Sequence, residues 1–196
     1  GTRLKNHAYA ATLKRIALEG PEAFYTGEIA ASMVDAARQP PHAGSLSLED
    51  LANYSVKVRP VICGPFRDLS LCTTAPPSSG AAQIMVTNLY GHLKPEEASN
   101  ADRIVAFVDA QRLAYADRDH YFGDPDEIDV PVDTLINPLY LEARAKDRFA
   151  PGAAPSPGNV SAFNQQFDAA GFAPDATQEM AGTTHLSIID GFGNAV

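Results

Sequence analysis

The residues that could carry out covalent chemistry lie near the end of the sequence, where Gly182 is followed by Thr183, Thr184 and His185. A threonine hydroxyl is a weak nucleophile unless a base beside it takes its proton. The α-amine of a threonine that begins a chain can be that base, because its ordinary pKa of about 8 leaves a useful fraction neutral near pH 7. Thr183 would gain such an amine if the peptide bond after Gly182 were cut.

A glycine before the threonine suits such a self-cleavage step. Without a Cβ, Gly182 permits strained backbone conformations and close approach by the attacking Thr183 hydroxyl. The same residues would also fit an ordinary strand start, because β-branched threonines pack well on a pleated sheet. Gly182-Thr183 is therefore a candidate self-cleavage site whose interpretation depends on the wider sequence.

The residues that follow predict a β-hairpin. Apolar side chains at Leu186 and Ile188, and again at Ala195 and Val196, enclose a run of turn residues at 190–194. A strand, a glycine-rich turn and a second strand in this order are typical of a hairpin. The candidate nucleophile would lie at the head of its first strand.

The stretch 183–196, TTHLSIIDGFGNAV, resembles the start of the small subunit of γ-glutamyltransferases. These enzymes are N-terminal-nucleophile hydrolases, made as one precursor and cut before a catalytic threonine. Motifs similar to the family's large subunit precede it in the family's order: 48–54 (LEDLANY), 76–80 (PPSSG), 114–118 (AYADR) and 122–125 (FGDP). The chain therefore resembles the C-terminal part of the large subunit joined to the start of the small subunit.

The resemblance implies that Thr183 acts twice. In maturation its hydroxyl would attack the Gly182 carbonyl, and hydrolysis of the resulting ester would free the α-amine. In catalysis the same hydroxyl would attack the γ-amide of glutathione or a related γ-glutamyl compound. The γ-glutamyl ester would then pass to water, an acceptor amino acid or a dipeptide. Thr184 and His185 would have supporting roles, and neither a cofactor nor a metal ion is implied.

Other active-site groups of the family have no counterpart in this sequence. The arginine that holds the substrate α-carboxylate would precede Gly1. The second threonine, the carboxylate for the α-amine and the oxyanion-hole glycines would follow Val196. Each missing oxyanion donor costs roughly 10²–10³ in rate. We therefore expect the 196-residue chain to be inactive alone and to need the remaining part of its precursor as a partner.

Two other functions are compatible with the sequence. An acylase of the same superfamily, similar to cephalosporin acylase, would share the Thr183 nucleophile and differ in its acyl pocket. A domain that kept the fold but is never cleaved would serve only in interactions. The change Thr183→Ala should abolish processing and turnover in an enzyme, and neither in a binding module.

The fold implied by the resemblance is α+β: the αββα sandwich of N-terminal-nucleophile hydrolases, of which this chain would supply a partial, helix-rich fragment. The chain would divide into a large-subunit portion (1–148), a mobile linker up to the cleavage site (149–182) and the first hairpin of the small subunit (183–196). Proline and glycine at 151–158 favour the linker by composition.

Helices and strands are also predicted from the pattern of apolar residues. Helical spacing predicts helices at 5–17, 21–25, 27–38, 47–53, 81–93, 101–121 and 139–147. Alternation predicts an antiparallel pair of strands at 56–63 and 69–74 with a turn at 66–68.

The long predicted helix at 101–121 has two parts. Its buried side is expected to contain Ile104, Val105, Phe107, Val108, Leu113 and Ala114. Its end carries Asp117, Arg118, Asp119 and His120. The two carboxylates point to different faces of a helix, so a solvated or ion-paired helix end is favoured over a catalytic or metal site.

The acidic loop at 123–129 is interpreted as a turn because it lacks the ligand order of an EF-hand.

Composition limits the partners. A formal net charge of −9 disfavours nucleic acid and anionic membranes. No run approaches the ~18 apolar residues of a membrane span. The first residues show no signal-peptide pattern, so a periplasmic or secreted location is an expectation from the resemblance alone.

Cys63 and Cys72 are too few for a disulfide framework or a zinc site. They flank the turn-like residues 64–68 and could face each other across a hairpin. Two buried free thiols are the favoured interpretation, and the bonded state stays open.

Overall fold

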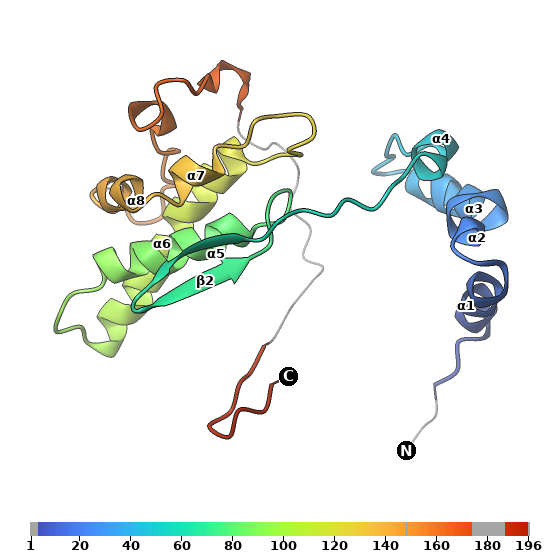
Figure 1. Ribbon diagram of the computed structural model, residues 1–196, viewed down its shortest axis with the longest axis horizontal. Helices are drawn as coiled ribbons and strands as arrows, with labels where there is room; N and C mark the ends of the chain where they lie inside the picture. Colours follow the sequence, from blue (N-terminus) through green and yellow to red (C-terminus); the bar gives the residue numbers. More distant parts are fainter. Residues whose placement is uncertain (1–3, 148, 174–186, 196) are drawn as a thin grey trace. The chain divides into compact units, whose positions relative to one another are not determined.

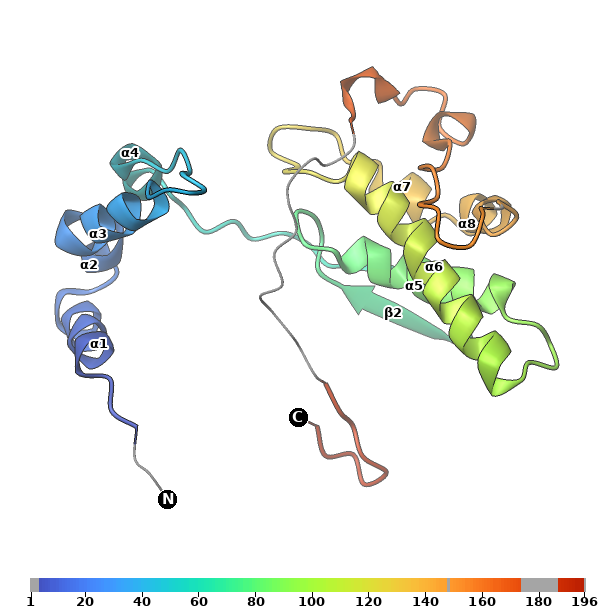
Figure 2. The same ribbon diagram turned by 180° about the vertical axis from the view of Figure 1, so that it is seen from behind.

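The computed structural model describes residues 4–147, 149–173 and 187–195. Contacts divide the chain into two units, Gly1–Val58 and Arg59–Val196, each of which is described by itself (Figures 1 and 2).

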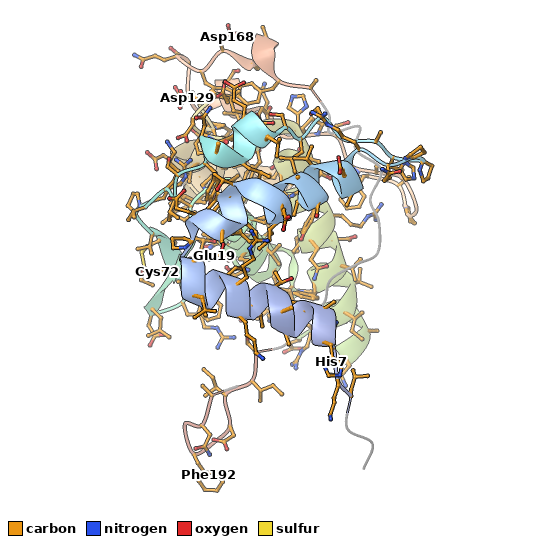
Figure 3. The ribbon with its side chains drawn as sticks, turned by 90° about the vertical axis from the view of Figure 1, so that its right-hand side faces the viewer. His7, Glu19, Cys72, Asp129, Asp168 and Phe192 are labelled. Atoms are coloured by element: carbon orange, nitrogen blue, oxygen red, sulfur yellow. A yellow bond between two sulfur atoms is a disulfide. The ribbon has the colours of Figure 1, made fainter. Side chains whose placement is uncertain are left out.

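The first unit is helical. It contains α1 (His7–Glu19), α2 (Glu22–Tyr25), α3 (Gly27–Ala37) and α4 (Leu48–Ala52). Figure 3 labels the two ends of α1, His7 and Glu19. Its small core joins α3 to α4 through Ala30, Val34 and Leu51. The four helices predicted for this part of the sequence are confirmed, with ends shifted by at most two residues.

Two helices begin with the same reciprocal cap. At α4 the Ser47 hydroxyl accepts a hydrogen bond from the Asp50 N–H (3.1 Å), and the Asp50 carboxylate accepts one from the Ser47 N–H (2.8 Å). Ser99 and Asp102 repeat this arrangement at the start of α6 (Asn100–Tyr121). The serine hydrogen bonds lower the pKa of both aspartates. Such caps satisfy backbone donors that a helix start leaves unpaired, which fixes where each helix begins.

The second unit contains one antiparallel hairpin, β1 (Ile62–Phe66) and β2 (Leu69–Thr73), which turns at Arg67 with a φ of 56°. The predicted second strand is confirmed, but the first begins at Ile62 and not at Val56. The pairing with β2 ends at Ile62, opposite Thr73, so residues 56–61 have no paired strand among the described residues.

Cys63 and Cys72 form a disulfide across this hairpin. The expectation of two buried free thiols is wrong, because both residues are exposed and occupy directly opposed register positions with Cα atoms 4.1 Å apart. Directly opposed residues of an antiparallel pair point to the same face, which brings the two sulfur atoms together. Figure 3 labels Cys72 on β2.

Helices form the rest of the second unit. They are α5 (Gly80–Leu93), α6, α7 (Val132–Leu135), α8 (Pro138–Arg144) and two short 3₁₀ helices, η1 (Val160–Ala162) and η2 (Ala169–Gly171). Helices α5 and α6 lie side by side, and both β1 and α8 contact α5 (Figures 1 and 2). The core contains Met85, Leu89, Ala110, Leu113, Ala114, Tyr121, Leu135, Tyr140, Leu141, Ala145, Val160 and Phe167.

The buried face of α6 differs from the prediction. Leu113 and Ala114 are buried as expected, whereas four apolar residues are 46–65% exposed: Ile104, Val105, Phe107 and Val108. The face toward the core carries Ala106, Ala110, Leu113, Ala114, Asp117 and Tyr121. Small residues on this face let α6 approach its neighbours closely, and the larger apolar side chains of its first half are left on the surface.

Residues 149–173 pack against the core at several points, including Phe149, Val160, Phe167 and Phe172. Val160 is fully buried and Phe167 nearly so, although composition predicted a loose linker. Two buried anchors are enough to hold a segment that is otherwise poor in aliphatic side chains. The division of the chain at residues 148 and 182 stays a prediction.

The described residues therefore form a helix-rich α+β structure, as expected. None of the helices in the described ranges is both long and apolar enough to cross a membrane.

The disulfide gives a first prediction. Replacing both cysteines, Cys63→Ser with Cys72→Ser, should lower the free energy of unfolding by about 2–3 kcal/mol, because a closed loop of about ten residues restricts the unfolded chain by that amount. Urea unfolding followed by circular dichroism measures the change. Alkylation of the unfolded wild-type protein without reductant should modify neither cysteine, and two modified cysteines would contradict the bond.

Candidate functional site

The candidate catalytic residues lie outside the described residues. Gly182, Thr183, Thr184 and His185 all fall within 174–186, so their roles stay predictions. The described residues that flank this range are Ala173 on one side and the hairpin at 187–195 on the other.

The downstream hairpin is built around Asp190. A bridge pairs Ile189 with Ala195, and the Asp190 N–H donates to the Asn194 carbonyl at 3.0 Å. The Asp190 carboxylate accepts from the N–H groups of Phe192 (2.8 Å) and Asn194 (2.9 Å) and from the Asn194 side-chain amide (2.7 Å). Figure 3 labels Phe192 in this turn. The described residues show the predicted turn and this single bridge, and the two strands of the predicted hairpin stay a prediction.

The charge on Asp190 supports the same turn. Hydrogen bonds from the Asn194 side chain, and then from backbone N–H groups, lower the pKa of this carboxyl. The group is therefore ionised at neutral pH and acts as an acceptor for all three donors.

Two of the family-like motifs meet at Arg118. Its Nε donates to the hydroxyl of Ser79, the residue before α5, at 3.0 Å, and its Nη1 lies 2.7 Å from the Asp119 carboxylate. The guanidinium also lies over the Tyr115 ring, 5.7 Å from its centre. The expected ion-paired helix end is confirmed for Arg118 and Asp119, and the contact with Ser79 was not predicted.

A cavity of about 360 Å³ opens beside this pair. It is lined by Pro77, Arg118, Asp119, Phe122, Gly123 and Ala173. Three motifs, at 76–80, 114–118 and 122–125, thus contribute to or border one cavity, together with the last described residue before the candidate cleavage site. Its wall offers a guanidinium and a carboxylate, groups that can hold polar parts of a peptide or an amino acid.

Asp117 is the centre of a second, buried polar cluster. Its side chain has no exposed surface, and its carboxylate accepts from the Gly158 N–H (2.7 Å), the Tyr140 hydroxyl (2.8 Å) and Arg144 (2.8 and 3.1 Å). Arg144, also buried, donates to the Ser156 carbonyl at 2.6 Å. These bonds join α6 and α8 to residues 156–158.

Burial and the neighbouring groups shift the pKa of Asp117 in opposite directions. Burial raises the pKa of the Asp117 carboxyl, and the neighbouring Arg144, the Gly158 N–H and the Tyr140 hydroxyl partly offset this effect. The pKa of Tyr140 is also raised, first by burial and then by Asp117, so its hydroxyl stays protonated and able to donate.

The position of Asp117 in the sequence is compatible with its burial but does not show which residues bind it. Asp117 lies four residues after Leu113 and four before Tyr121, so it falls within the apolar stripe of a helix. A carboxylate in such a stripe needs a partner, because an unpaired buried charge is very costly. An ion pair was among the expectations, but Arg144, 27 residues away, could not be identified from spacing.

The acidic loop at 123–129 forms a turn, as expected. The N–H groups of Glu127 and Ile128 donate to the Asp124 carbonyl, both at 3.0 Å. Arg59 lies 3.5 Å from the Asp124 carboxylate and 3.0 Å from that of Asp126. Among the residues that the structure describes, no three His, Cys, Asp or Glu side chains are grouped so as to hold a metal ion.

Comparison with known proteins covers the whole chain. The model of the gamma-glutamyltranspeptidase family matches residues 1–196. The chain is similar to the glutathione hydrolase proenzyme of Escherichia coli (strain K12), with 32% identity over 100% of this chain and 32% of that protein. It is also similar to the acylase ACY 1 proenzyme of Pseudomonas sp. (strain SE83), with 31% identity over 100% of this chain and 33% of that protein.

A solved structure gives the same relationship. The gamma-glutamyltranspeptidase of Helicobacter pylori aligns with 94% of this chain and 49% of its own, at a TM-score of 0.60 and 30% identity. The chain spans about a third of the length of the curated relatives that it matches.

The buried cluster gives a second prediction. Asp117→Ala should lower the free energy of unfolding by about 3–5 kcal/mol, because it leaves the Arg144 charge buried without its partner. Asp119→Ala, two residues along the same helix, removes a half-exposed pair and should change it by about 0.5 kcal/mol or less. Urea unfolding of both variants measures the difference, and equal losses would contradict a buried charge pair.

Proposed function

Because the chain belongs to the gamma-glutamyltranspeptidase family, we propose that it is part of a precursor that cuts itself between Gly182 and Thr183 and then transfers γ-glutamyl groups through Thr183. The observation that supports the proposal is that the family match covers residues 1–196 and so includes both sides of this bond. Glutathione or a related γ-glutamyl compound is the proposed donor, and water, an amino acid or a dipeptide the acceptor.

Family membership agrees with the fold class. The helix-rich α+β structure corresponds to part of the αββα sandwich of N-terminal-nucleophile hydrolases, since the chain resembles a solved member over 94% of its length. This confirms the fold class expected from the sequence.

All the atoms that are exchanged in the maturation step come from the scissile peptide and one water molecule. The Thr183 hydroxyl oxygen attacks the Gly182 carbonyl carbon, and the C–N bond breaks as the Thr183 nitrogen takes a proton. The resulting ester joins Gly182 to the Thr183 oxygen. Water hydrolyses this ester, which leaves a Gly182 carboxylate and a free Thr183 α-amine.

In turnover the new α-amine serves as the base. It takes the proton of the Thr183 hydroxyl as the oxygen attacks the γ-amide carbonyl. It then passes this proton to the donor nitrogen, and the C–N bond breaks as the amine leaves. A γ-glutamyl ester on Thr183 remains, and water or an acceptor amine resolves it. Thr184 and His185 support the nucleophile's backbone in this proposal.

The described hairpin supports the proposal from the downstream side. Asp190 receives three hydrogen bonds within its turn, so the chain that follows Thr183 has a defined path from Ser187 onward.

The exposed side of α6 supports the proposed partner, the remaining part of the same precursor. Four apolar side chains, Ile104, Val105, Phe107 and Val108, lie on this surface. A group of large apolar side chains on a surface is typical of a face that another protein segment covers.

A second function in the same superfamily is an acylase that acts on a different acyl group. It is favoured by one observation, the similarity to the acylase ACY 1 proenzyme at 31% identity. The nucleophile and the maturation step would be the same, so only a substrate assay separates the two. Turnover of γ-glutamyl-p-nitroanilide supports the first function, and turnover of a cephalosporin amide side chain alone supports the second.

The disulfide supports a periplasmic or secreted location. Cys63 and Cys72 are exposed and bonded. Exposed disulfides persist in oxidising compartments and are rare where glutathione and thioredoxin keep thiols reduced.

The third prediction tests Thr183 in the full-length precursor. The wild-type protein should separate into two chains, the second of which begins with Thr183. Thr183→Ala should stay uncut and lose about 10³-fold or more of its activity, because no hydroxyl is left to form either ester. Intact-mass spectrometry over a time course measures the processing.

Thr183→Ser is the matched control, since it keeps a hydroxyl and should be cut. An uncut wild-type protein would contradict the enzyme and favour the interaction domain. Cleavage of Thr183→Ala would show that another residue or a protease cuts the chain.

A further inference from the structure

We propose that the disulfide between Cys63 and Cys72 is a site of reversible exchange with small thiols of the glutathione class, and not only a bond that stabilises the hairpin. The site lies on the surface of the second unit, and its chemistry does not require the γ-glutamyl transfer proposed above. The exposure of the bond, the uncharged residues beside it and the contacts that hold the hairpin on α5 lead to this inference.

The disulfide lies on the face of the hairpin that points away from α5. Successive residues of a strand point to opposite faces. Gly64 is buried, and a Cβ there would lie inside contact distance of the Ile84 side chain, so its face of the hairpin packs on α5. Cys63 and Cys72 lie on the other face as a directly opposed pair, and both are exposed. A thiol in solution can therefore approach the two sulfur atoms without unfolding the chain.

The residues beside the bond in the two strands are uncharged. The attacking species in the exchange is a thiolate, and glutathione carries carboxylates as well. Neither β1 nor β2 contains an aspartate or a glutamate, and the next opposed pair on the same face, Pro65 and Ser70, is exposed. The turn between the strands adds one charge of each sign, Arg67 and Asp68. The hairpin therefore presents its disulfide on a neutral surface, which an anionic thiol can approach.

Two equivalents of thiol open the bond. The first thiolate attacks the Sγ of one cysteine, the bond between the two Sγ atoms breaks, and its electron pair stays on the other Sγ, which takes a proton from water. A second thiolate attacks the sulfur of the bound small thiol, which releases the small-molecule disulfide and leaves the second cysteine as a thiol. Two small thiols are thereby oxidised to one disulfide, and the protein disulfide is reduced to two thiols.

Contacts with α5 hold the hairpin when the bond is open. The Asn88 side-chain amide donates to the Pro65 carbonyl at 3.0 Å, and the Thr73 hydroxyl donates to the Gln83 side-chain oxygen at 3.2 Å. The first contact lies near the turn and the second at the open end of the hairpin, and the strands pair over five positions between Ile62 and Phe66. Two thiols that stay opposite each other have a high effective concentration, so the bond can close again.

The bond closes a loop whose ends are only nine residues apart in the sequence. Such a short loop restricts the unfolded chain less than a long one does, so less stability depends on the bond. Exposed disulfides are also the ones that exchange readily, whereas the structural disulfides of secreted proteins resist reduction by glutathione. The Cys63–Cys72 bond combines exposure with a hairpin that other contacts hold, which suits a bond that opens and closes.

The fourth prediction tests access in the full-length precursor with Thr183→Ala, in which the proposed activity cannot consume glutathione. The folded protein is incubated with reduced glutathione, quenched with acid, alkylated, digested and measured by mass spectrometry. Cys63 and Cys72 should both become alkylated, less than about 100-fold more slowly than in urea, because exchange of an exposed bond needs no unfolding. Exchange through the unfolded fraction alone would be about 10³-fold or more slower. A precursor that also carries Cys63→Ser and Cys72→Ser gives the background.

Closure of the bond tests the contacts with α5. After glutathione is removed, addition of glutathione disulfide should restore the bond in the folded protein. Asn88→Ala removes the contact with Pro65 and should slow this closure about two- to tenfold, the factor that one hydrogen bond contributes. His92→Ala changes an exposed residue one helical turn further along α5, so it is the matched control and should close at the wild-type rate.

Three outcomes overturn the proposal. Reduction of the folded protein more than about 100-fold slower than in urea would show that the bond opens only when the chain unfolds. A reduced protein that glutathione disulfide does not reclose would show that the exchange is not reversible. Equal closure rates for Asn88→Ala and His92→Ala would show that α5 does not hold the open hairpin. Failure of the proposed function is distinguishable, because a precursor that is never cut at Thr183 can still exchange this bond.

Discussion

The buried carboxylate of Asp117 is the constraint around which the second unit is organised. Because a charge without exposed surface must be compensated, α8 supplies Arg144 and Tyr140 to the same point, and the chain that follows supplies the Gly158 N–H. The requirement for glycine at 158 is a consequence, since the backbone must approach α8 closely enough to reach the carboxylate. One side chain thus fixes three segments that are distant in the sequence.

Patterns among residues close in the sequence predicted most of the helices and the second strand. The disulfide and the buried ion pair depend on contacts between residues that are farther apart. Ser47 with Asp50, and Ser99 with Asp102, are caps whose residues lie three positions apart, so the starts of α4 and α6 could be located from the sequence. The disulfide forms because the strand register places Cys63 opposite Cys72. Their positions on either side of a turn are compatible with this register but also with others. The partner of Asp117 is a matter of tertiary structure, and no local pattern identifies Arg144.

The candidate site shows the same limit. Gly182 and Thr183 fit a self-cleavage site because the proposed nucleophile and the bond that it would attack are neighbours in the chain. The four residues alone also fit an ordinary strand start, so the candidate depends on the resemblance of the wider sequence. The contact of Arg118 with Ser79 joins motifs 39 residues apart, and only folding brings them to one cavity. Sequence reasoning can therefore suggest a candidate nucleophile more readily than the groups that would surround it.

Helix α6 combines these points. In this helix Asp117 is buried and Phe107 is exposed. Hydrophobicity alone would predict an exposed aspartate and a buried phenylalanine. The buried charge is satisfied within the described residues, so that face of the helix is complete. On the other face, the Phe107 ring packs edge-to-face against Tyr90 with ring centres 6.2 Å apart, and it remains 48% exposed. The chain spans about a third of the length of its curated relatives. Helix α6 therefore has a mostly apolar core face whose single buried charge is paired, and a second face on which large apolar side chains are exposed. Exposed apolar groups of this kind are typical of surfaces that bind another protein segment.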